Sequence, residues 1–85
     1  MSWESAVKQL DPGTNIFKVL VYLSFKGHKL PSEIAGETGI KPGSVRPALR
    51  ALLDMGLVAQ EPGGRYSSRI PFTDVVSYLY SLVLK

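Results

Sequence analysis

Cysteine is absent from this chain of 85 residues, and histidine occurs once, as His28. The chain therefore offers no disulfide framework and no thiolate or multi-histidine zinc site. Its seven carboxylates are dispersed, and its serines have no histidine within a motif that could act as a general base. We expect no catalytic residue, no metal and no cofactor, so the chain is predicted not to be an enzyme, and His28 is interpreted as a solvated loop residue.

Long apolar runs are missing as well. Outside the C-terminal segment the longest is VLVYL, residues 19–23, far short of the roughly 20 residues that a membrane span needs. The first residues, MSWESAVKQLD, lack the basic segment, apolar core and cleavage site of a secretory signal. We therefore expect a cytoplasmic protein that has no membrane partner.

The remaining composition is that of an ordinary globular chain. Hydrophobic residues make up 45% of the sequence and charged residues 20%, which is neither disordered nor membrane-like. A chain of this length can bury one modest core. Residues 1–85 are accordingly predicted to form a single domain.

The net charge of +3 is concentrated in residues 41–69. In residues 1–40 and in residues 70–85 the positive and negative side chains cancel, whereas residues 41–69 hold five cations against Asp54 and Glu61. Four of the five cations are arginines, whose planar guanidinium suits a phosphate or a base edge. These cations are Lys41, Arg46, Arg50, Arg65 and Arg69.

Apolar spacing predicts three helices in the first half of the chain. Trp3, Val7 and Leu10 indicate a short N-terminal helix. A second helix is predicted over 12–26, with Asp11 as the N-cap, Pro12 in the first turn and a glycine stop at residue 27. A third is predicted over 32–38, between Ser32 as the N-cap and a glycine at residue 39. Residues 28–30 form an extended bridge between the last two.

The segment KPGSVRPALRALLDMGLV, residues 41–58, has helical spacing but contains Pro47. A helix over 44–55 with Ser44 as its N-cap would place Pro47 at the third helical position, where no intrahelical hydrogen bond is lost. Arg46 and Arg50 then fall on the exposed face together with Pro47. The opposite face is predicted to be buried and consists of Val45, Ala48, Leu49, Leu52 and Leu53.

Residues 57–70 are predicted to form a β-hairpin, with strands at 57–61 and 65–70. Pro62 and Gly63 suit the central positions of a type II turn. The last segment is predicted to be a helix over 72–84, with a core stripe of Phe72, Val75, Val76, Leu79 and Val83. Apolar residues remain on its other faces and predict a dimer contact through Tyr78, Tyr80, Leu82 and Leu84.

The order of these elements resembles a winged helix-turn-helix domain of bacterial and archaeal transcription regulators. The resemblance lies in LPSEIAGETGIKPGSVRPALRALLDMGLV and the following PGGRY, about half of the chain. GSVRPAL is similar to the helix start of PadR-type regulators, and the SEIA to GLV run and RYSSRIPF are similar to TrmB-type regulators. The implied fold class is α+β, mainly α: helices packed with a small two- to three-stranded antiparallel sheet, and a C-terminal helix.

The resemblance implies that helix 44–55 is a recognition helix lying in the major groove of double-stranded DNA. Arg46 and Arg50 are then expected to contact base edges or phosphate, and Pro47 lies between them, facing a thymine methyl or making no contact. Lys41 and the Ser44 hydroxyl are expected to touch the DNA backbone. The hairpin is expected to contact the phosphates or minor groove of flanking DNA through Arg65 and, as a weaker candidate, Arg69.

Three functions stay open at this point. The first is a sequence-specific transcription regulator, homodimeric through the C-terminal helix and associated with the nucleoid. The second is a winged-helix protein-interaction module in a transcription or chromatin assembly, without direct DNA binding. The third is nonspecific coating of chromatin. For each basic side chain, a merely solvated position remains the alternative to a DNA contact.

Overall fold

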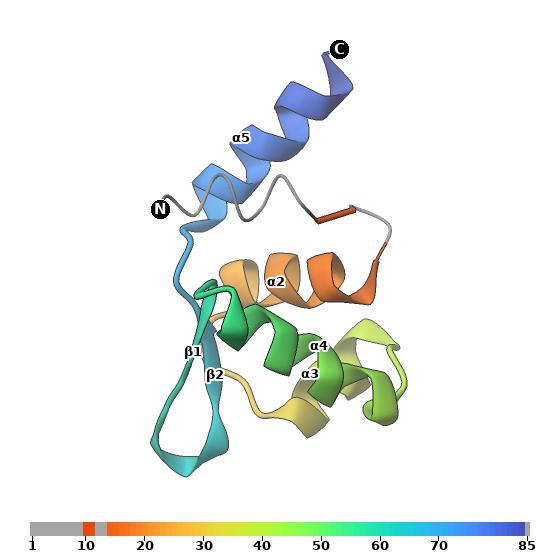
Figure 1. Cartoon of the computed structure of the whole chain (residues 1–85), viewed down its shortest axis with the longest axis vertical. Coiled ribbons are helices and arrows are strands. Elements are labelled where there is room, and N and C mark those ends of the chain that lie inside the picture. The colour runs from red at the N-terminus through yellow and green to blue at the C-terminus, as the bar shows by residue number, and fades with distance from the viewer. Residues whose placement is uncertain (1–9, 12–13, 85) are drawn as a thin grey trace.

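Three helices, a β-hairpin and a last helix follow one another in the computed structural model, which describes residues 10–11 and 14–84 (Figure 1). The helices are α2 (Asn15–Lys26), α3 (Pro31–Thr38), α4 (Pro42–Asp54) and α5 (Phe72–Val83); the strands are β1 (Val58–Gln60) and β2 (Tyr66–Ser68). The predicted α+β, mainly α fold class is confirmed, in a winged-helix-like arrangement. The short helix predicted around Trp3 and Val7 lies outside the described residues.

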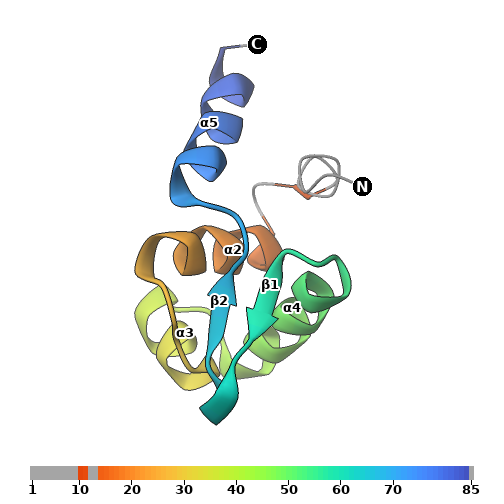
Figure 2. The same ribbon diagram turned by 90° about the vertical axis from the view of Figure 1, so that its left-hand side faces the viewer.

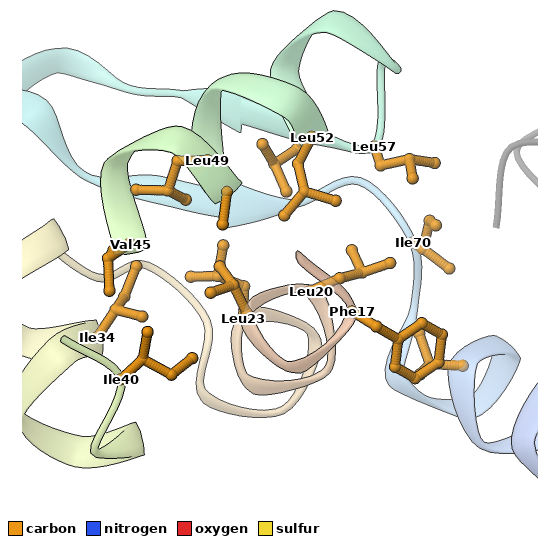
Figure 3. Close-up of a cluster of buried hydrophobic side chains, with 14 of the residues drawn as sticks. Phe17, Leu20, Leu23, Ile34, Ile40, Val45, Leu49, Leu52, Leu57 and Ile70 are labelled. Atoms are coloured by element: carbon orange, nitrogen blue, oxygen red, sulfur yellow. The ribbon is translucent and has the colours of Figure 1, made fainter. Parts of the chain in front are cut away.

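The core lies where α2, α3 and α4 meet the hairpin (Figure 3). Helix α2 contributes four buried side chains because its apolar residues recur at helical spacing. The predicted buried face of α4 is confirmed except for Leu53, which is half-buried. The fully enclosed large side chains of the core are Leu20, Leu23, Ile34, Leu49, Leu52 and Leu57.

Two helices begin at residues other than those predicted. Helix α2 starts at Asn15 and not at residue 12, because the Thr14 hydroxyl accepts a hydrogen bond from the Phe17 N–H, at 3.3 Å, and so caps the first turn. Asp11 is therefore not the N-cap; its carbonyl accepts from Thr14 instead. Helix α3 starts at Pro31, with Leu30 and not Ser32 in the cap position, because a proline fits the first helical position.

The N-cap of helix α4 lies three residues before the predicted one. Pro42 occupies the first helical position, and the Lys41 carbonyl accepts hydrogen bonds from the N–H groups of Ser44 and Val45 at 2.8 and 3.2 Å. The prediction that Ser44 caps this helix is therefore wrong. Pro47 lies inside the helix at its sixth position, so the Gly43 carbonyl receives no i→i−4 hydrogen bond from it. Pro47 therefore removes one backbone hydrogen bond of the helix, contrary to the prediction that none is lost.

The hairpin has the predicted turn but shorter strands. Val58 pairs with Ser68 and Gln60 with Tyr66 in an antiparallel ladder. The Gly64 N–H donates to the Glu61 carbonyl at 3.1 Å, and the intervening Gly63 has φ 87° and ψ 0°, the values of the third residue of a type II turn. Lys29 adds a single antiparallel bridge to Tyr66, which confirms the extended segment expected at 28–30.

Helix α5 packs on α2 and extends away from the hairpin turn, which lies at the opposite end of the molecule (Figures 1 and 2). Of the predicted core stripe only Val75 is buried, and Leu79 is half-buried. Phe72, Val76 and Val83 are exposed, because the helix meets the body through a different arc of its surface. None of the helices in the described part of the chain has the length and apolar character that a bilayer span requires.

Candidate nucleic-acid interface

Helix α4 presents a basic face to solvent. Arg46, Pro47 and Arg50 are all exposed, while Val45 and Leu49 on the other side are fully buried. Arg46 and Arg50 stand one helical turn apart and therefore project from the same face. Within residues 10–11 and 14–84 neither guanidinium forms an ion pair. Their charges are thus available to an external anion.

The start of α4 is also open. Lys41, Pro42 and Gly43 are exposed, whereas Ser44 is half-buried. A methyl group added at Gly43 would meet no atom within 4 Å, so a second molecule can approach the backbone at this point. Sequence reasoning missed Gly43, because it placed the helix start after this residue. The signal that could have found it is Pro42, since proline favours the first helical position.

Arg65 is held by an intramolecular partner. Its guanidinium Nη1 lies 3.1 Å from Oε1 of Glu33, in the first turn of α3. The same carboxylate accepts a hydrogen bond from the Leu30 N–H at 2.8 Å. This backbone hydrogen bond first, and then the charges of Arg65 and Lys29, hold the pKa of Glu33 below its ordinary value. Arg65 thus joins the hairpin to α3, and only its remaining N–H groups can face a phosphate.

Two further side-chain contacts connect neighbouring elements. The Lys29 ammonium lies 3.6 Å from Oε2 of Glu37 on α3. His28 Nδ1 contacts the Glu61 carboxylate at the beginning of the hairpin turn. His28 is exposed as expected, but it is also a contact to the hairpin. Sequence reasoning missed these contacts because in each the two members stand on different elements.

Arg69 lies at the other end of β2 from Arg65. Its N–H donates to the Leu57 carbonyl at 2.9 Å, and its side chain is exposed. Together with Leu23 and His28 it lines an open hollow of about 310 Å³ between the end of α2 and the strand. The five predicted DNA-binding cations therefore divide into two groups: Lys41, Arg46 and Arg50 on α4 and its cap, and Arg65 and Arg69 flanking β2.

The residues predicted as a dimer contact do not share one environment. Tyr80 and Leu84 are exposed, whereas Tyr78 and Leu82 are half-buried. The Tyr78 ring lies against Phe17 of α2, with 6.0 Å between the ring centroids. Tyr78 therefore packs on the body of its own chain.

No family model, curated protein or solved structure matches the chain. What the molecule does must accordingly be argued from its own geometry and charge.

Proposed function

We propose that this chain is a sequence-specific, double-stranded-DNA-binding transcription regulator that inserts α4 into the major groove. The observation that carries the proposal is the pair Arg46 and Arg50, which stand on one exposed face of α4 with no acidic partner among the described residues. The major groove of B-DNA admits an α-helix, and arginine forms bidentate hydrogen bonds with guanine there.

The position of Pro47 also favours a functional role for this exposed face of α4. It lies between the two arginines, is exposed, and removes a backbone hydrogen bond inside α4 without filling any part of the core. Departures from local helix rules that lack a packing benefit are expected at functional sites. A contact between the Pro47 ring and a thymine methyl is one use for this position.

The remaining predicted contacts surround this face. Lys41 and the backbone at Gly43 are exposed at the start of α4, where a phosphate can approach. In the proposed complex the hairpin meets flanking DNA through the free N–H groups of Arg65, with Arg69 as a weaker contact. Glu33 and the Lys29 bridge set the position of the hairpin relative to α3.

The experiment is selection of bound sequences from random duplex DNA, followed by titration of the selected site. Arg46→Ala and Arg50→Ala should each weaken binding by about 1–3 kcal/mol if the residue reads a base. The affinity of the parent should fall steeply with salt, because each neutralised phosphate releases counterions. Lys18→Ala is the matched control, since Lys18 is an exposed cation on α2 and its loss should leave site preference unchanged. Unchanged affinity and preference in the Arg46→Ala, Arg50→Ala double variant would exclude the assignment.

A second function is a winged-helix protein-interaction module that does not bind DNA. The exposed apolar residues of α5 and the modest net charge favour it. A gel-shift titration on mixed duplex DNA separates the two, because such a module shows no binding even at low salt. Equal affinity for selected and random duplexes would instead indicate nonspecific chromatin coating.

A further inference from the structure

An exposed apolar surface covers α5 and the end of α2; we call it the α5 patch. It consists of Phe25, Phe72, Val76, Tyr80, Val83 and Leu84. Phe25 and Phe72 join the two helices within it, since their ring centroids lie 5.1 Å apart with 53° between the planes. The side chains are far from buried: Val83 is 78% exposed, Tyr80 63% and Phe25 62%.

The patch is one continuous arc of α5. At 3.6 residues per turn, Phe72, Val76 and Val83 lie within about 40° of one another, and Tyr80 and Leu84 extend this arc to about 120°. The neighbouring arc packs on the body through Val75, Tyr78 and Leu79. The remaining arc is polar and contains Asp74, Ser77 and Ser81, whereas Thr73 lies within the apolar arc, between Tyr80 and Leu84. The exposed apolar face is therefore separate from the face that builds the core.

The size of the patch points to a partner. At about 150–250 Å² for a whole aromatic side chain, the exposed fractions of Phe25, Phe72 and Tyr80 amount to roughly 250–400 Å². That is a third to a half of the about 800 Å² that each partner buries in a standard interface. The three aliphatic side chains enlarge it further. Monomeric proteins rarely expose apolar patches of more than a few hundred Å².

The charge pattern indicates which partner fits. In a two-fold contact every charge near the axis faces its own copy, so a surface that pairs with itself is best left uncharged. No member of the patch is charged, although the Lys26 ammonium lies over the Phe25 ring, 5.5 Å from its centroid. Asp74, the one charged residue within Phe72–Val83, lies on the polar arc. A membrane-surface helix would need lysine or arginine on that arc, and Asp74, Ser77 and Ser81 stand there instead.

We infer that the α5 patch is the contact surface of a homodimer and is covered by the same patch of a second copy. The inference corrects the residues that the sequence suggested: Tyr78 and Leu82 leave the surface, and the residues that join it are Phe25, Phe72, Val76 and Val83. It does not depend on the proposed function. In a dimer through α5, the hairpins and both α4 faces remain uncovered, because α5 projects from the opposite end of the molecule (Figure 2).

Sedimentation of the full chain over a range of concentrations, without DNA, tests the inference. The parent should behave as a species of twice the 9.3 kDa chain mass. Val76→Glu should weaken the dimer by at least roughly 100-fold, because a carboxylate would be buried without a partner. Ser81→Glu is the matched control: it adds the same charge in the middle of the polar arc, about 140° from Val76, and should remain dimeric. Circular dichroism should show unchanged helix content in both variants.

Tyr80→Glu provides a second variant at a more exposed position, so that the test does not depend on Val76→Glu folding. A parent that stays at 9.3 kDa at every concentration would overturn the inference, as would a dimer that survives both patch substitutions. Co-sedimentation of a monomeric parent with zwitterionic phospholipid vesicles, lost in Val76→Glu, would assign the patch to a membrane surface and also overturn it. None of these measurements involves DNA. A negative result would therefore overturn the dimer without affecting the proposed role of Arg46 and Arg50 in DNA binding.

Discussion

Arg65 Nη1 lies 3.1 Å from Glu33 Oε1, and the same carboxylate oxygen accepts the Leu30 N–H at 2.8 Å. One side chain thus closes the first turn of α3 and holds the hairpin against it. Together with the backbone bridge between Lys29 and Tyr66, this contact fixes where the hairpin stands relative to α3. The proposed DNA-binding surface, which uses α4 and the hairpin, needs such a connection, because a short two-stranded hairpin is marginal alone.

Glu33→Gln should lower the thermal unfolding temperature, because it weakens the hydrogen bond at the start of α3 and removes the ion pair to Arg65. The folded-state pKa of Glu33 is lowered, so its contribution is present above the ordinary value of 4.5 and is lost as pH falls through the folded value. Unfolding followed by circular dichroism at neutral and acidic pH should therefore show a flatter acid dependence in Glu33→Gln than in the parent.

Asp54→Asn is the control for this prediction, since Asp54 is exposed at the end of α4 and forms no ion pair with the described residues. It should leave the acid dependence of the parent unchanged. Identical pH profiles for Glu33→Gln and the parent would mean that the carboxylate contributes nothing to holding the hairpin.

Pro47→Ala should raise the free energy of unfolding by about 1–3 kcal/mol, because it restores the hydrogen bond to the Gly43 carbonyl and removes the clash of the ring. Pro42→Ala should change stability little, since a proline in the first turn costs no helical bond. Urea denaturation measures both. If the Pro47 ring contacts DNA, the stabilised variant should bind the selected site no better than the parent. A loss of stability in Pro47→Ala would contradict the helix geometry.

Gly39→Ala and Gly36→Ala should change stability in opposite directions. Neither added methyl group would meet an atom within 4 Å, so packing does not distinguish the two sites. Gly39 has φ 77°, where an alanine is strained, whereas Gly36 lies inside α3. We expect Gly39→Ala to cost about 1 kcal/mol and Gly36→Ala to contribute up to about 1 kcal/mol in chemical denaturation. Equal effects would mean that α3 does not end where the structure places its end.

Tyr22→Phe should remove an alkaline transition in stability. The Tyr22 hydroxyl is enclosed, and burial, followed by the Glu37 carboxylate beside it and then by the charge of Glu33, raises its pKa to about 12. A raised pKa stabilises the folded state below the ordinary value of 10.0, and this contribution is lost as pH rises toward about 12. The parent should therefore become less stable over this range, and Tyr22→Phe should lose less stability.

Tyr80→Phe serves as the control, because Tyr80 is exposed on α5 and should leave the alkaline loss unchanged. Thermal unfolding of the three proteins is compared at several pH values from about 9 to about 12, a range that covers the ordinary and the raised pKa of Tyr22. An alkaline loss of stability as large in Tyr22→Phe as in the parent would contradict the raised pKa of Tyr22.

Local signals in the sequence determined the elements themselves. Apolar spacing placed Val45, Ala48, Leu49 and Leu52 on the buried face of α4, and therefore Arg46 on the exposed one. These features depend on neighbours within a few residues, which is why a single sequence reveals them. Local signals did not determine the helix starts, because several nearby residues can serve as the cap. Thr14 and not Asp11 caps α2, and α4 begins at Pro42, ahead of the predicted cap Ser44.

Only the tertiary structure decided which surfaces meet. Glu33 and Arg65 are 32 positions apart, and no local sequence pattern predicts their ion pair. On α5, apolar residues occupy most of the circumference, so spacing alone could not say which arc packs on α2. The fold buries the arc of Val75 and leaves Val76 exposed, because α5 packs on α2 through the arc that also holds Tyr78. The sequence by itself thus determined the helices and the basic face of α4, whereas packing between distant segments decided the position of the hairpin and the apolar surface of α5.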